Sequence, residues 1–120
     1  MKPLVVISAI NLALAVGLGA FGAHALKDQL AAGALETYKI GSQYHQIHGI
    51  GALAASFVAN KIGVAPAWLL LTGTWIFGFS LYLLAVTGTK WLGAIAPIGG
   101  VCLIGGYLLL AYQGGKLATL

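Results

Sequence analysis

Charge is the scarcest property of this chain of 120 residues. It contains six lysines, one aspartate, one glutamate and no arginine, so that only 7% of its residues are charged. A soluble domain carries about 25% charged residues, because its surface must face water. Since 60% of the residues are hydrophobic, the composition instead predicts one integral membrane domain over residues 1–120.

The distribution of the basic residues argues against nucleic-acid binding. The lysines lie singly, at positions 2, 27, 39, 61, 90 and 116. They form no basic stripe, and the arginine that usually binds phosphate in a bidentate manner is missing. Each lysine lies near the end of an apolar run, where a long side chain can reach lipid headgroups. We therefore expect the lipid bilayer, and no nucleic acid, as a partner.

The residues that carry enzymatic or redox chemistry are equally few. Cys102 is the single cysteine, so the chain has neither a disulfide framework nor a CxxC pair. The apolar segments contain no carboxylate, the group that carries charge in a small multidrug antiporter. No Ser-His-Asp or Cys-His group can be assembled from the sequence. We therefore predict a protein without catalytic activity, and the sequence leaves any cofactor unknown.

Four apolar segments account for most of the chain, at about 4–25, 42–61, 67–86 and 91–112. Each approaches the ~20 residues that cross a ~30 Å hydrocarbon core. The first segment is longer than the ~7–15 apolar residues of a signal peptide, which favours a retained transmembrane helix. Short polar breaks make the later neighbours antiparallel. The predicted fold class is an all-α membrane protein, a four-transmembrane-helix bundle.

The second segment is the most informative, because its apolar part, 47–59, is too short to span. To reach ~20 residues the helix must begin near Ser42 and include His45 and His48. Both histidines are therefore predicted at the membrane edge or close beneath it. The polar stretch 26–43 between the first two helices either lies on the membrane surface or extends the second helix outward.

Along the antiparallel path, most polar groups gather toward one leaflet, and Asn11 falls toward the other half. His45 and His48 share a helix face through their i, i+3 spacing. With His24, and with Asp28 or Glu36 as an oxygen ligand, they are weak candidates for a zinc or other transition-metal site. A structural polar cluster that joins the helix ends is the main interpretation, and a ligand-binding or proton-linked site is the third.

Small residues recur at four-residue spacing on two faces of the first helix. One face carries Ala9, Ala13 and Gly17, and the other carries Ala15, Gly19 and Ala23. Small residues let transmembrane helices approach closely and gain van der Waals contact. They indicate tight packing within one bundle or an interface between copies, and we expect a homo-oligomer.

Four motifs carry a resemblance to a known family. They are GAFGAHAL (19–26), YHQIHG (44–49), FGFSLYLLAV (77–86) and APIGG (96–100). In these motifs the chain resembles the small bacterial inner-membrane proteins of the YgdD/YwdK type, a domain-of-unknown-function family, over essentially its whole length. The resemblance implies a multi-pass protein of the bacterial plasma membrane with both termini cytoplasmic and the histidine side outward.

The resemblance brings no activity, but it selects among the polar residues. It favours His24 with His48 as the better histidine pair, because His45 looks peculiar to this sequence. We therefore predict a structural or accessory membrane protein with a polar cluster in one leaflet. The alternative is a small-molecule, lipid or metal-ion binder or transporter that uses the same cluster. The cluster comprises His24, Tyr44, His48, Ser80 and Tyr82.

Overall fold

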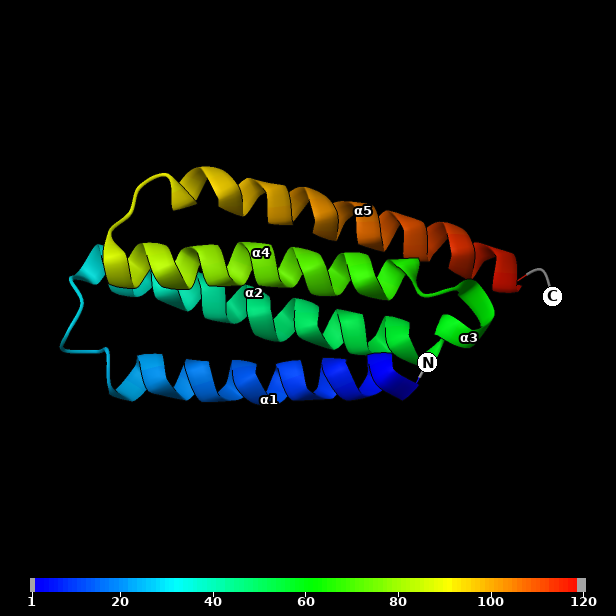
Figure 1. Ribbon diagram of the computed structural model, residues 1–120, viewed down its shortest axis with the longest axis horizontal. Coiled ribbons are helices and arrows are strands. Elements are labelled where there is room, and N and C mark those ends of the chain that lie inside the picture. The colour runs from blue at the N-terminus through cyan, green and yellow to red at the C-terminus, as the bar shows by residue number, and fades with distance from the viewer. Residues whose placement is uncertain (1, 119–120) are drawn as a thin grey trace.

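The computed structural model describes residues 2–118, and in this part of the chain it contains helices and no strand. The helices are α1 (Lys2–His24), α2 (Ala32–Phe57), the single turn α3 (Ala59–Ile62), α4 (Ala65–Thr87) and α5 (Leu92–Ala118). The four long helices lie side by side in the order α1, α2, α4, α5 (Figure 1). The molecule is a flat bundle of 53 × 26 × 18 Å, in which the start of α1 and the end of α5 lie at the same end.

Three of these helices are long and apolar enough to cross a membrane. They are α1 over Pro3–His24, α4 over Ala65–Thr87 and α5 over Leu92–Lys116. At 1.5 Å per residue, the 26 residues of α2 extend for about 39 Å. Helix α2 is thus long enough to span a membrane. Because of its polar residues, it is not among the three described helices that are also apolar enough to do so.

The start of α2 differs from the expectation, because the helix begins at Ala32 and not near Ser42. Of the two alternatives for the polar stretch, the structure shows the one that extends the helix. Gly41 does not interrupt α2, because it packs against α4: a Cβ at this position would lie 3.0 Å from the Cβ of Leu81 and 3.1 Å from the carbonyl oxygen of Gly78. This close approach of two backbones outweighs the weak helix propensity of glycine.

Helices α4 and α5 also approach each other through glycine. A Cβ on Gly73 would lie 2.8 Å from the carbonyl oxygen of Gly99, and a Cβ on Gly99 would lie 2.7 Å from that of Gly73. Neither position has room for a side chain. Gly99, in the fourth predicted segment, therefore serves packing within the bundle.

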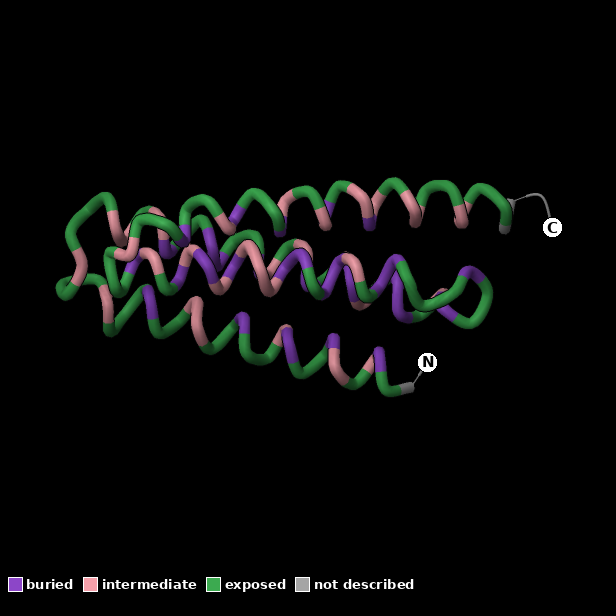
Figure 2. The backbone as a smooth tube through the Cα atoms, turned by 45° about the horizontal axis from the view of Figure 1, so that its top comes forward, coloured by how far each residue is buried: buried purple, intermediate pink, exposed green. Residues whose placement is uncertain are grey.

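Buried residues form two apolar clusters toward opposite ends of the bundle. At the end that holds the termini, the core comprises Leu4, Ala52, Ala55, Ala59, Ala67, Leu70, Leu71 and Leu103. At the other end it comprises Tyr38, Tyr82 and Ala85. Exposed residues run along α1 and α5 (Figure 2), and they include apolar ones such as Val16 and Val101. An apolar outer surface on the long helices is what contact with lipid tails requires.

Candidate functional site

Four polar and aromatic side chains from α1, α2 and α4 meet in the interior of the bundle. Nε2 of His45 lies 2.7 Å from Oδ1 of Asn11, and Nδ1 of the same ring lies 2.9 Å from the hydroxyl of Tyr82. The indole Nε1 of Trp75 donates to the same Asn11 oxygen at 2.8 Å. We call Asn11, His45, Trp75 and Tyr82 the histidine network. It joins three helices through one imidazole ring.

The hydrogen-bond partners determine the direction of each bond in the histidine network. An indole N–H can only donate, so the Asn11 atom that faces Trp75 must be its oxygen. That oxygen can only accept, so His45 must carry a proton on Nε2. In a neutral ring Nδ1 then accepts, and the Tyr82 hydroxyl donates to it. The three bonds are mutually consistent and leave the ring with both nitrogens paired.

The histidine network is buried at mid-depth. His45 is only 1% exposed, and Asn11 only 3%. By the helical rise, Asn11 lies about 14 Å from the start of α1 and about 20 Å from its end, and His45 lies at the midpoint of α2. Gly49 brings α1 and α2 together beside it, since a Cβ there would lie 2.8 Å from Cδ2 of Leu12.

This position corrects two expectations. His45 was expected at the membrane edge and Asn11 in the other half of the bundle, but the two side chains share a hydrogen bond halfway along their helices. The cause is the earlier start of α2, which moves the histidines toward the helix centre. In the described part of the chain His45, and not His24, bonds to neighbouring helices.

His48 and Tyr44 form a second set of contacts on the neighbouring face of α2. Nδ1 of His48 lies 2.7 Å from the hydroxyl of Tyr107, which links α2 to α5. The Tyr44 ring stacks on Phe77 of α4, with 4.1 Å between centroids, and also lies beside the His48 ring. The Tyr107 ring passes directly over Gly51, where a Cβ would collide with it.

Two residues of the predicted cluster lie apart from these contacts. The hydroxyl of Ser80 donates to the carbonyl oxygen of Ile76 in its own helix, so it connects no second element. His24 is exposed at the end of α1. Leu12 of α1 lies level with Gly49 of α2, the neighbour of His48. His24 is twelve residues beyond Leu12, so it lies about 18 Å farther along α1 than the level of His48.

The histidines are therefore not arranged as a metal site. Within residues 2–118, no group of three or more His, Cys, Asp or Glu side chains lies close enough together to hold a metal ion. His24, the third histidine of the candidate set, is too far along α1 to join the other two. Both His45 and His48 use Nδ1 on a tyrosine hydroxyl.

Sequence reasoning missed three residues of the site, Asn11, Trp75 and Tyr107. A signal existed for Asn11, because an amide in the middle of an apolar span needs a partner on another helix. Aromatic belts form at helix ends, but Trp75 and Tyr107 lie in the middle of their helices. Their polar N–H and O–H groups therefore also indicated a partner on another helix. Which partners they take depends on helix packing, and no spacing in the sequence specifies it.

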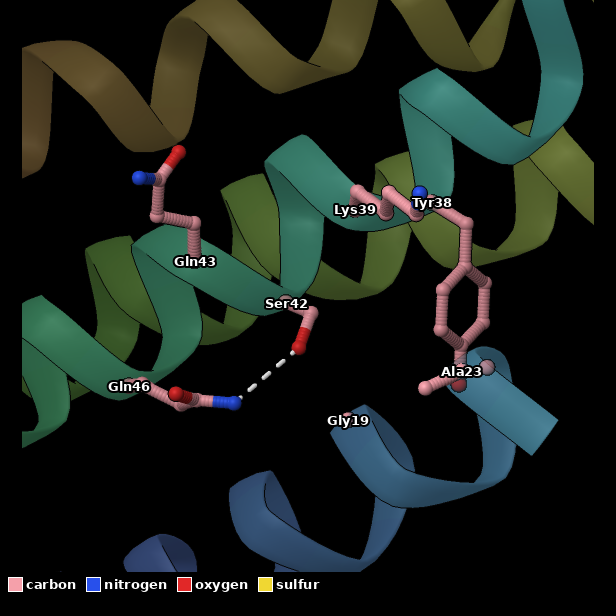
Figure 3. A pocket seen from close by; sticks show the side chains of 8 residues that line it. Gly19, Ala23, Tyr38, Lys39, Ser42, Gln43 and Gln46 are labelled. Carbon is pink, nitrogen blue, oxygen red and sulfur yellow. Dashed lines mark hydrogen bonds between the residues drawn. The ribbon is translucent and has the colours of Figure 1, made fainter. Parts of the chain in front are cut away.

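A groove of about 330 Å³ opens between α1 and α2 (Figure 3). Glycines and Ala23 on α1 face polar side chains on α2, and the lining comprises Gly19, Gly22, Ala23, Tyr38, Lys39, Ser42, Gln43 and Gln46. The Ser42 and Gln46 side chains point toward α1 and are joined to each other, with the Gln46 amide donating to the Ser42 hydroxyl at 3.2 Å. We call this the α1–α2 groove.

A second hollow of about 240 Å³ continues the α1–α2 groove toward the end of α1. It shares Gly22, Ala23 and Lys39 with the groove and adds Lys27 and Leu35. The Tyr38 hydroxyl donates to the carbonyl oxygen of Leu18 at 2.7 Å, and its ring packs on Tyr82 at 4.8 Å between centroids. Tyr38 therefore separates the groove from the histidine network.

These features define a small helical integral membrane protein whose polar side chains are gathered inside the bundle. Comparison with known proteins agrees. The chain matches the model of the DUF423 family, described as "Protein of unknown function", over residues 18–100, and it belongs to this family. The resemblance seen in the four sequence motifs is thus confirmed.

Full-length relatives support the same assignment. The chain is 40% identical to the UPF0382 membrane protein YwdK of Bacillus subtilis, over 97% of this chain and 98% of the relative. It is 41% identical to the UPF0382 membrane protein SSP2132 of Staphylococcus saprophyticus, over 92% and 94% respectively. No solved structure matches the chain. Both relatives are named as membrane proteins, and neither name states an activity.

Proposed function

We propose that this protein is a four-span structural or accessory protein of the bacterial plasma membrane, without catalytic activity. The observation that carries the proposal is the set of hydrogen bonds by which His45 joins three helices. Both ring nitrogens of His45 are paired to other helices, and the ring is 1% exposed. Neither His45 nor His48 lines the α1–α2 groove or its continuation. Asn11 and Trp75 line a separate hollow of about 280 Å³, and the Nδ2 atom of Asn11 has no hydrogen-bond partner among the described residues. The hydrogen bonds of His45 to two other helices nevertheless stabilise the arrangement of the bundle.

The proposal includes α2 as the fourth span. Helix α2 packs between α1 and α4 (Figure 1), and its polar side chains at His45 and His48 turn toward other helices. Its exposed positions include Ile47 and Ile50, which suit lipid contact. A polar residue inside a membrane is tolerated when it faces the bundle interior and finds a partner there.

Cysteine labelling tests the span count and the orientation. In a Cys102→Ala background, single cysteines at Asp28 and Gly63 would mark the two ends of α2, and one at Gly115 would mark the C-terminal end of α5. With four spans and cytoplasmic termini, an impermeant maleimide added to intact cells labels position 28 and leaves 63 and 115 unlabelled. Equal labelling at 28 and 63 would contradict a spanning α2.

The structural role is tested by separating stability from binding. His45→Leu removes the centre of the histidine network, so we expect a lower free energy of unfolding and an unchanged metal content of the purified protein. Stoichiometric metal in the parent chain that is lost from both His45→Leu and His48→Leu would favour the metal-binding alternative over the structural one.

We further propose a homo-oligomer that uses the small-residue face of α1. Ala9, Ala13 and Gly17 are exposed, and a Cβ at Gly17 would meet nothing within 4 Å, whereas Ala15 on the opposite face is fully buried against the bundle. An exposed small-residue face allows close approach of another helix. Gly17→Ile is expected to shift the protein toward the monomer in detergent, with Gly100→Ile on α5 as the control.

A further inference from the structure

The α1–α2 groove lies toward the end of the apolar span of α1. The apolar span of α1 ends at His24, and the groove residues Gly19, Gly22 and Ala23 occupy its last two turns. Lys27 lies just beyond the span and lines the continuation of the groove. A site at the end of a span is where the polar part of a lipid meets the protein.

The groove presents cations and hydrogen-bonding groups without a partner of opposite charge. Neither Lys27 nor Lys39 forms an ion pair with any residue in the described range 2–118. Both carboxylates of the chain, Asp28 and Glu36, are exposed and line neither hollow. Two unpaired ammonium groups therefore flank one recess.

The floor and wall of the groove add shape and polarity. Gly19 and Gly22 let side chains of α2 pack directly on the α1 backbone, since a Cβ on Gly19 would lie 2.6 Å from Nε2 of Gln46 and a Cβ on Gly22 would collide with Cε1 of Tyr38. Gln46 uses one amide N–H on Ser42, which leaves its second N–H to donate elsewhere. A donor beside two cations suits the oxygens of a phosphate ester.

We propose that the α1–α2 groove binds the headgroup of an anionic phospholipid. Lys39 in the groove and Lys27 in its continuation contact the phosphate, and Gln46 donates to its ester or headgroup oxygens. A lipid is favoured over a soluble phosphate because the groove opens along the side of the bundle at the end of an apolar span. Phe21, in the same turns of α1, is 51% exposed and available to an acyl chain.

Native mass spectrometry of the full chain in detergent tests the proposal with dioctanoyl phosphatidylglycerol as the probe. Each lysine near a membrane surface contributes about fivefold to binding of an anionic lipid, so Lys27→Gln with Lys39→Gln is expected to weaken binding by about 25-fold. Lys90→Gln removes one charge at the same end of the bundle but outside the groove. It is expected to change binding by less than about twofold.

Two alanine-to-phenylalanine variants test the site by steric blocking, without any change of charge. Ala23→Phe fills the groove from α1, whereas Ala20→Phe adds the same ring at an exposed position that does not line it. Only Ala23→Phe is expected to abolish the lipid adduct, with both variants retaining the thermal stability of the parent. Equal loss in both variants would overturn the proposal.

Two further probes identify the source of the phosphate. Dioctanoyl glycerol, which lacks the phosphate, is expected to bind at least about tenfold more weakly, because it gives the lysines no charge to contact. Glycerol 3-phosphate at the same concentration is expected not to displace the lipid. Equal binding of dioctanoyl glycerol, or full displacement by glycerol 3-phosphate, would overturn the assignment to an anionic phospholipid.

Discussion

Nε2 of His45 on α2 lies 2.7 Å from Oδ1 of Asn11 on α1, and both atoms are buried at the middle of their helices. The same oxygen accepts from Trp75 on α4. Each of these groups would be unpaired in lipid without the others, since hydrocarbon offers no hydrogen bond. The contributions of His45 and Asn11 to stability are therefore expected to be coupled.

A double-mutant cycle tests this coupling. His45→Leu and Asn11→Leu are each expected to lower the free energy of unfolding by about 1–3 kcal/mol, because each leaves buried partners unsatisfied. The double variant should lose less than the sum of the two, by about 0.6–1.7 kcal/mol. Unfolding in mixed micelles with increasing SDS gives the free energies. Strict additivity would contradict the coupling, and His24→Leu, at an exposed position, serves as the control.

The two tyrosine–histidine bonds are expected to differ in strength. Tyr82→Phe removes the donor to the fully buried His45 ring, whereas Tyr107→Phe removes the partner of His48, which is half-buried. We expect a loss of about 1–2 kcal/mol for Tyr82→Phe and a smaller loss for Tyr107→Phe. The same SDS titration measures both, and Tyr112→Phe, at an exposed site, should change nothing. A larger loss at Tyr107 would contradict the ranking.

Glycine substitutions on α4 and α5 test the close approach of these helices. Gly73→Ala would place a methyl group 2.8 Å from the carbonyl oxygen of Gly99 and 2.9 Å from the backbone nitrogen of Leu103. Neither backbone atom can move aside alone, so a loss of about 1–3 kcal/mol is expected. Gly100→Ala has nothing within 4 Å and should be neutral or stabilising by up to about 1 kcal/mol. Equal effects would contradict the packing.

The early start of α2 predicts that a substitution at Gly33 stabilises the protein. Gly33 lies in the first turn of the helix, and a Cβ there would meet nothing within 4 Å. Gly33→Ala is therefore expected to stabilise the protein by about 0.5–1 kcal/mol, because alanine loses less backbone entropy in a helix. The thermal midpoint in detergent should rise accordingly. No change would indicate that the helix begins nearer to Ser42.

The composition alone determined that this is a helical membrane protein, because so few charges cannot cover a water-facing surface and long apolar runs match the bilayer. Both ends of α1 and α4 and the start of α5 followed from those runs to within two residues, whereas α5 continues to Ala118, six residues beyond the predicted end at 112. The start of α2 at Ala32 could not be predicted in this way, because the first turns of the helix are polar and belong to no apolar run. The packing of Gly41 against Gly78 supports them instead.

Only the tertiary structure decided which polar residues meet. Spacing placed His45 and His48 on one side of α2, but they bond to different helices, His45 to α1 and α4 and His48 to α5. The physical reason is that a buried polar group takes whichever partner the helix register brings level with it. A shift in where one helix begins moves every such pairing, and residue spacing within one helix cannot reveal that shift.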